Sequence, residues 1–200
     1  MLRLSVTALE SFRYWKGREE ATIDDLRADL TYSSPKTPQM EAGGAMARAL
    51  EDAQAGDLGI VERDGWTFDF SGLDAEMALP ETRELKGTAL FATPSGPVTL
   101  SAKADAVGGI ICRDAKLTER WDAEKYIDSL QWRSYCLVFG SPVFVYDIFV
   151  GRYKGRRVEV VEYHPLRFYT YPDVRRDVER AVAELAAVVR EHGIIPETQP

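Results

Sequence analysis

Residues 97–105, with the sequence PVTLSAKAD, alternate between apolar and polar side chains, which is typical of a β-strand with one buried face. One face would carry Val98, Leu100, Ala102 and Ala104, and the other Thr99, Ser101, Lys103 and Asp105. The stretch AVGG predicts a turn, after which IICRDAK is expected to run back as a mostly buried strand. The sequence therefore predicts a β-hairpin over residues 97–116.

Charged side chains interrupt this apolar hairpin. Asp114 and Lys116 are two residues apart on the second strand, so both should project from one face, while Asp105 ends the first strand. Pairing of the strands would bring Asp105 and Asp114 together. Adjacent carboxylates repel, and one is driven towards protonation unless a cation lies between them. Since Mg²⁺ is bound through one or two carboxylates with water and substrate phosphate, the pattern favours a divalent metal site.

Lys116 has two possible roles beside such a metal. It can orient or help to deprotonate an attacking water, or it can neutralise charge on a scissile phosphate. The alternative is that Asp114 and Lys116 form a surface ion pair on an edge strand. Gln131 favours the metal site, because it is a polar residue in an otherwise core-facing row of the next expected helix and needs a hydrogen-bond partner.

The order of the expected elements predicts an α/β fold with a central mixed sheet flanked by helices. The first helix is expected in TALESF, where Thr7 and Glu10 have the spacing of a capping box. Further helices are expected over residues 22–30, 40–54, 118–140 and 173–193. A hairpin turning at Lys154-Gly155 is expected before the last of them.

We expect one domain over residues 1–200. It would consist of an N-terminal helical part at 1–56, a sheet core with the long helix at 57–172 and a C-terminal helix at 173–193.

Composition excludes several classes of protein. The net charge of −7 excludes a surface coated in positive charge, although residues 1–18 and 152–157 contain local basic patches. Two cysteines, Cys112 and Cys136, are too few for a disulfide framework. No apolar run approaches the roughly 20 residues of a membrane span, and the N-terminus lacks a signal-peptide pattern. We expect a cytoplasmic protein with no membrane partner.

The ordered set of Asp105, Asp114-Ala115-Lys116 and Gln131-x-x-x-Tyr135 resembles the PD-(D/E)XK nuclease superfamily. Within it, the set is similar to the RecB-like branch, which includes CRISPR-associated and phage recombination exonucleases. The segment LSVTALESF also resembles the family's opening helix, so the resemblance covers about residues 3–150. It implies a restriction-endonuclease-like core.

The resemblance also implies roles for individual residues. Asp105, Asp114 and the Ala115 carbonyl would bind Mg²⁺ or Mn²⁺, and Asp105, Asp114 and Lys116 would be catalytic. Gln131 and Tyr135 would hold DNA or brace the site. Trp132 is either a core residue or a surface on which a nucleotide stacks. The cysteine cluster found in some members of the branch is absent, so no iron–sulfur cluster is expected.

The sequence departs from the branch at one position. A histidine ligand usually occupies the last position of a G-x-x-x-H pattern, and here Gly44-Ala-Met-Ala-Arg48 carries arginine, which cannot ligate a cation. Either the ligand is lost or Glu41 or Glu51 on the same helix replaces it. Alternatively, Arg48 binds a phosphate.

The sequence thus predicts a metal-dependent deoxyribonuclease, with an exonuclease favoured over an endonuclease. A role in phage-type recombination, a homo-oligomer and a recombination partner protein are expected by resemblance only. One alternative is a catalytically inactive relative that binds DNA or a protein partner, which Arg48 favours. A second is an unrelated α/β protein.

Overall fold

A computed structural model describes residues 1–53, 58–73 and 82–197. The described helices are α1 (Val6–Lys16), α2 (Ile23–Leu30), α3 (Pro38–Asp52), α4 (Glu124–Ile127), α5 (Leu130–Phe139) and α6 (Val174–Glu191). The described strands are β1 (Leu2–Ser5), β2 (Ile60–Arg63), β3 (Trp66–Asp69), β4 (Thr82–Thr93), β5 (Gly96–Gly108), β6 (Ile111–Thr118), β7 (Val143–Lys154) and β8 (Arg157–Tyr169).

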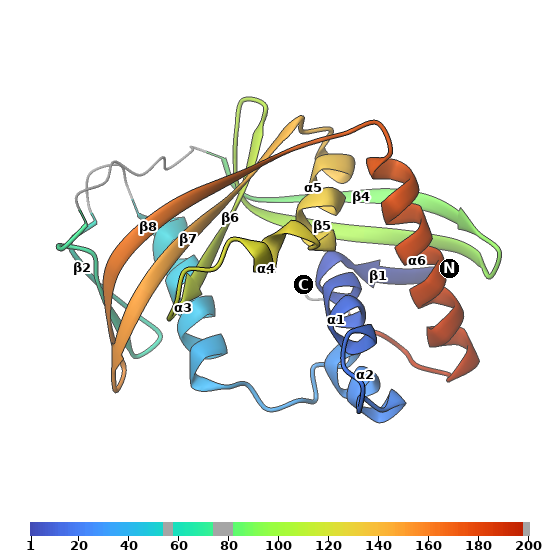
Figure 1. Ribbon diagram of the computed structural model, residues 1–200, viewed down its shortest axis with the longest axis horizontal. Helices are drawn as coiled ribbons and strands as arrows, with labels where there is room; N and C mark the ends of the chain where they lie inside the picture. The colour runs from blue at the N-terminus through green and yellow to red at the C-terminus, as the bar shows by residue number, and fades with distance from the viewer. Residues whose placement is uncertain (54–57, 74–81, 198–200) are drawn as a thin grey trace.

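The strands form a single mixed sheet in the order β1-β5-β6-β7-β8-β3-β2, with β4 paired to β5. The β1–β5, β6–β7 and β3–β8 pairs are parallel and the remaining pairs are antiparallel. Helices α1, α5 and α6 gather at the end of the sheet that contains β1, β4 and β5, and α3 lies at the other end (Figure 1). The predicted α/β fold with a central mixed sheet flanked by helices is confirmed.

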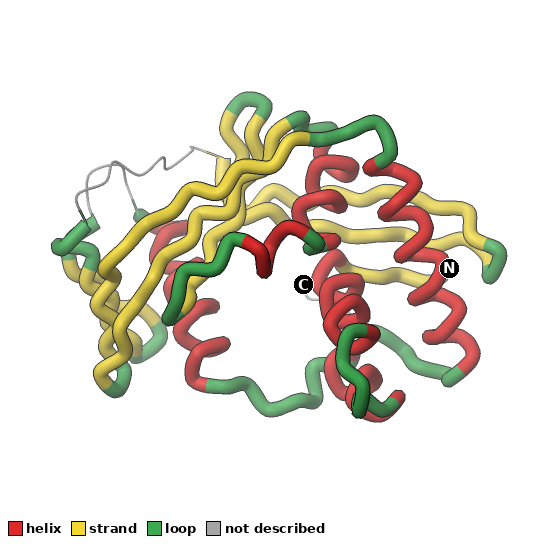
Figure 2. The backbone as a smooth tube through the Cα atoms, in the orientation of Figure 1, coloured by secondary structure: helices red, strands yellow, loops and turns green. Residues whose placement is uncertain are grey.

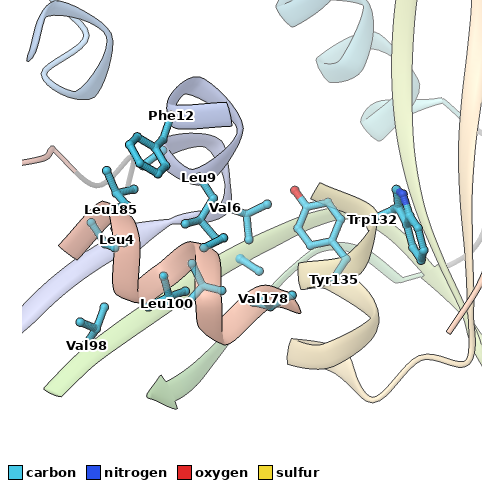
Figure 3. Close-up of a cluster of buried hydrophobic side chains, with 14 of the residues drawn as sticks. Leu4, Val6, Leu9, Phe12, Val98, Leu100, Trp132, Tyr135, Val178 and Leu185 are labelled. Atoms are coloured by element: carbon cyan, nitrogen blue, oxygen red, sulfur yellow. The ribbon is translucent and has the colours of Figure 1, made fainter. Parts of the chain in front are cut away.

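The larger core lies between β1, β4 and β5 and the helices α1, α5 and α6. The amphipathic pattern of α6 buries one row of its residues against this end of the sheet. Figure 3 shows the central side chains of this core, which are Leu4, Leu9, Phe12, Val98, Leu100, Val178 and Leu185. This core holds α5, and therefore Gln131 and Tyr135, against the sheet.

A second core lies between α3 and strands β3, β7 and β8. Helix α3 contributes Met46, Ala49 and Leu50 to it, and Ala115 and Leu117 of β6 pack against it. Residues 31–37 connect α2 to α3 and so join the two ends of the molecule, as the loop in Figure 2 shows. Strand β6 therefore contacts both cores, one on each face.

Two local predictions are wrong. Helix α1 begins after Ser5, whose hydroxyl accepts a hydrogen bond from Ala8 N, so Thr7 and Glu10 do not form a capping box. The helix predicted over residues 118–140 is interrupted, because Ser129 begins a new helix by accepting from Gln131 N. Gly140 ends that helix in the left-handed conformation, at the residue where the predicted helix also ended.

None of the helices in the described ranges is both long enough and apolar enough to span a membrane.

Candidate active site

The candidate site lies where β5 changes its neighbour. The first half of β5 pairs with β1 through Ser101, whereas its last three residues pair with β6, beginning at Ala106 opposite Arg113. Asp105 comes directly before that pairing and Asp114 directly after it. The Asp105 Oδ2 atom accepts a hydrogen bond from Ala115 N at 2.9 Å, so a side chain replaces the backbone ladder at this point. The two strands diverge where the two carboxylates lie.

Asp114 is buried, with 4% of its surface exposed, and its two oxygens have different surroundings. Oδ1 accepts a hydrogen bond from Gln131 Nε2 at 2.9 Å. Oδ2 lies 2.6 Å from Lys116 Nζ but makes no hydrogen bond of good geometry to any residue in the described ranges. The alternative that Asp114 and Lys116 are a surface pair is therefore wrong for Asp114.

The charges of the site shift one another's protonation. Burial raises the pKa of Asp105 from 3.8 to about 7, and the charge of Asp114 adds to this shift. Burial also raises the pKa of Asp114, against the lowering effect of Lys116. Burial acts to lower the pKa of Lys116, but the nearby carboxylates outweigh it and the pKa is raised. The site therefore contains one ammonium group facing two carboxylates that are costly to ionise.

The raised pKa of Asp105 predicts a pH dependence of stability. The folded protein keeps the Asp105 proton up to about pH 7, whereas the unfolded chain loses it near 3.8, so this residue makes folding less favourable as pH rises between these values. We therefore compare the free energy of unfolding of Asp105→Asn with that of the unsubstituted protein in metal-free buffer. We expect this comparison to favour the variant more at pH 8 than at pH 5. Urea unfolding of both proteins at both pH values measures this, and a pH-independent difference would contradict it.

Helix α5 braces the site through two side chains four residues apart. Tyr135 donates its hydroxyl hydrogen to the Lys103 carbonyl at 2.7 Å, and Gln131 Oε1 accepts from the Tyr146 hydroxyl at 3.3 Å. Both residues were predicted by resemblance to brace the site or hold DNA, and the described contacts place them against β5, β6 and β7. Figure 3 shows Tyr135 projecting from α5 towards the sheet.

Glu10 has a role that its position in the sequence did not indicate. Its Oε2 accepts a hydrogen bond from Leu130 N at 2.9 Å and another from the Ser129 hydroxyl at 3.2 Å. A carboxylate at a helix N-terminus satisfies free N–H groups and interacts favourably with the helix dipole. Helix α1 therefore fixes the start of α5, one residue before Gln131.

A cleft of about 1030 Å³ contains the carboxylates and lies between α3 and the strands β1, β4, β5 and β6. Gly43, Gly44 and Ala47 form much of the α3 wall, and an added Cβ at Gly43 would meet no atom within 4 Å. Arg83 joins this wall to the sheet by donating hydrogen bonds to carbonyl oxygens at the end of α3. Small residues on one wall keep the cleft open above the carboxylates.

Of the candidate site residues predicted on α3, two line the cleft and one does not. Glu51 and Arg48 line the cleft, and Arg48 Nε lies 2.6 Å from Asp64 Oδ2. Glu41 does not line the described cleft, and its carboxylate lies 3.7 Å from Arg156 Nη2. Of the two glutamates proposed to replace the missing histidine, the structure brings Glu51 to the cleft.

The hypothesis that Trp132 stacks on a nucleotide is corrected by its burial. Trp132 is 5% exposed, its ring stacks on Phe168 at 4.8 Å, and its indole N–H donates to the Ile127 carbonyl. One face of the ring is thus covered by Phe168, and its polar edge is used within the fold. Figure 3 shows Trp132 and Tyr135 at different positions on α5.

Sequence reasoning missed two charged residues of the cleft. Lys103 forms an ion pair with Glu84, and the register of β4 and β5 places Glu84 opposite Asp105. Glu84 has a φ of 52°, a left-handed conformation that is strained for a residue with a side chain. The alternation of residues 97–105 placed Lys103 on the same face of the strand as Asp105. It did not indicate that a strand carrying Glu84 would pair with β5.

The oxygen atoms of the site fit a hard divalent cation. The two carboxylates lie together, and the buried Asp114 Oδ2 has no well-formed hydrogen bond within the described ranges. The pKa of Asp105 is raised first by burial and then by its acidic neighbour Asp114. Within the same ranges, no group of three or more His, Cys, Asp or Glu side chains is arranged to hold a metal ion. The protein itself would therefore contribute two carboxylates, which suffices for Mg²⁺ when water and substrate phosphate complete the shell.

Comparison with known proteins finds solved structures that share the fold of this chain. No family model and no curated protein matches the sequence. The chain is similar to the crystal structure of SSO0001, with a TM-score of 0.54 and 13% identity over 94% of this chain and 77% of that chain. This likeness shows a shared fold.

Two structures of LHK-Exo, an alkaline exonuclease from Laribacter hongkongensis, also match. The complex with dAMP has a TM-score of 0.43 and 13% identity over 95% of this chain and 93% of that chain. The second structure has a TM-score of 0.42 and 13% identity, over 96% and 91% of the two chains.

Proposed function

We propose that this protein is a metal-dependent deoxyribonuclease of the PD-(D/E)XK superfamily. The observation that supports it best is the position of Asp105 and Asp114 side by side where β5 and β6 diverge, with Lys116 Nζ 2.6 Å from Asp114 at the base of an open cleft. The order of these residues along the chain is that of the superfamily motif. An exonuclease, and a role in phage-type recombination, are proposed from the resemblance alone.

In this proposal, Asp105, Asp114 and the Ala115 carbonyl would hold Mg²⁺ or Mn²⁺. The ion would supply positive charge for the phosphate and lower the pKa of a bound water. Lys116 would hold its proton towards the reacting oxygens, because its raised pKa keeps it charged at neutral pH. Gln131 would keep Asp114 in one orientation through the hydrogen bond to Oδ1.

Incubation of the protein with linear and covalently closed circular DNA tests the proposal. We expect cleavage of linear DNA with Mg²⁺ or Mn²⁺, no cleavage with a chelator, and loss of cleavage in Asp114→Asn, which keeps the side-chain shape but removes its charge. Resistance of the closed circle supports the exonuclease. Failure of the unsubstituted protein to cleave either DNA under any of these conditions would overturn the proposed activity.

A second candidate is a catalytically inactive DNA-binding protein of the same fold. It is favoured by Arg48 at the position where the resembled branch has a histidine, with its side chain paired to Asp64. Calorimetric titration of Mn²⁺ separates the candidates. Binding that Asp105→Asn abolishes supports the nuclease, whereas DNA binding without Mn²⁺ binding supports the inactive relative.

A further inference from the structure

A polar face of the sheet continues outward from the carboxylates. Along β5, Thr99, Ser101 and Lys103 alternate with Val98, Leu100 and Ala102, which are buried against the helices. The first set therefore lies on the side of the sheet away from α1 and α6. Asp105 is two residues beyond Lys103 and continues this row.

Neighbouring strands extend the row on both sides. Register pairs Thr99 with Arg3 of β1, and it pairs Lys103 with Lys86 of β4. Side chains directly opposite each other in a sheet project from the same face. Ser101 is flanked in the same way by Ser5 and Thr88. We call this the open face, and it consists of Arg3, Ser5, Lys86, Thr88, Ser101 and Lys103, all of which line the cleft.

Two cations of the open face are available to an anion. In the described ranges, Arg3 and Lys86 form no ion pair, whereas Lys103 is paired with Glu84 and Lys116 with Asp114. Arg3 of β1 and Lys86 of β4 lie on opposite flanks of β5, about 10 Å apart across the strands. Their partners Thr99 and Lys103 are four residues apart, so the two cations are also offset by about 13 Å along β5. The width across the strands accommodates one nucleic-acid strand along β5.

We propose that the open face holds the nucleic-acid strand that leads to the scissile phosphate, with Arg3 and Lys86 contacting its phosphates. The inference rests on the proposed function and adds the path of the substrate. The six side chains of the open face are cations and hydroxyls with no aromatic ring among them, and the exposed Leu90, opposite Thr99, lies at its outer end. Binding through such groups reads the phosphate backbone and not the base sequence. The strand would follow β5 from Thr99 towards Asp105.

Fluorescence anisotropy with a labelled single-stranded oligothymidylate, in the presence of a chelator, tests this path without cleavage. We expect Arg3→Gln/Lys86→Gln to weaken binding about tenfold and to reduce the slope of log K against log salt by about 1.4, since each phosphate contact on a single strand contributes about 0.7. The control is Arg167→Gln/Arg190→Gln, which removes the same charge from exposed arginines of β8 and α6. We expect the control to bind like the unsubstituted protein.

Several results would overturn the path. They are equal binding by both double variants, an unchanged salt slope, or no binding of the oligonucleotide by the unsubstituted protein. Cationic side chains on edge strands such as β1 and β4 also discourage edge-to-edge association, so the molar mass of each variant is measured by light scattering. A variant that self-associates but binds normally would overturn the path as well.

A cleavage assay of the same proteins keeps the two proposals separate. Cleavage by the unsubstituted protein, with normal binding by Arg3→Gln/Lys86→Gln, would overturn the path and leave the nuclease standing. Absence of cleavage by every protein, with weakened binding by this variant alone, would overturn the nuclease and support only the binding of a nucleic-acid strand along β5.

Discussion

Replacement of Lys116 by methionine is expected to slow metal-dependent DNA cleavage by about 10²- to 10⁴-fold, the range found when a group that positions or transfers a proton is removed. Methionine keeps most of the length of the side chain and removes its charge. Lys116 Nζ lies 2.6 Å from Asp114 Oδ2, so the substitution removes the ammonium group beside the candidate metal ligands. Single-turnover cleavage of linear DNA measures the effect.

The control for this variant is Lys16→Met. Lys16 Nζ also lies 2.6 Å from a carboxylate oxygen, that of Glu184, but this pair is exposed on the surface of α1 and α6. We expect the control to cleave at the rate of the unsubstituted protein. A Lys116→Met protein that is folded and cleaves within twofold of that rate would contradict the role given to Lys116.

Replacement of Arg113 by methionine is expected to lower the free energy of unfolding by about 3–5 kcal/mol, because it leaves a buried carboxylate without its partner. Arg113 binds Asp147 through two hydrogen bonds of 2.8 and 2.6 Å, and Tyr163 donates to the same carboxylate at 2.6 Å. Asp147 is buried, and this network lies on the face of β6 opposite Asp114.

Urea unfolding measures the loss in the free energy of unfolding. Two further variants show whether the loss comes from the unpaired buried charge. Arg113→Met/Asp147→Leu removes both charges and is expected to recover most of the stability, since apolar replacements of buried pairs are often neutral. Arg63→Met breaks an exposed pair with Asp52 and should cost no more than about 1 kcal/mol. A loss for Arg113→Met as small as that for Arg63→Met would contradict the prediction.

The hairpin that carries the candidate site could be predicted because strand periodicity is local. The alternation of residues 97–105 and the glycines that follow were enough to place Asp105 near Asp114 and Lys116 beside it. Gln131 could be predicted to contact the site for a similar reason, since a polar side chain in an apolar row needs a partner, and Asp114 is that partner.

Features that depend on packing between distant segments could not be predicted. The sequence offered Thr7 and Glu10 as a capping box, but Glu10 instead caps α5, more than a hundred residues away. Helical spacing put Glu41 and Glu51 on one helix, but the orientation of α3 is set by its packing in the second core. Four-residue strands such as β1 and β2 are too short for periodicity to identify them.

Different parts of the fold determine the position of the two carboxylates and the shape of the cleft. The carboxylates owe their position to the point at which the backbone of one strand leaves its neighbour, whereas the cleft walls are formed by side chains of α3, β1 and β4. Substitutions on the walls can therefore accumulate without moving the candidate site. Under the proposed function, substrate preference could drift in an evolutionary lineage with this architecture while the chemistry is retained.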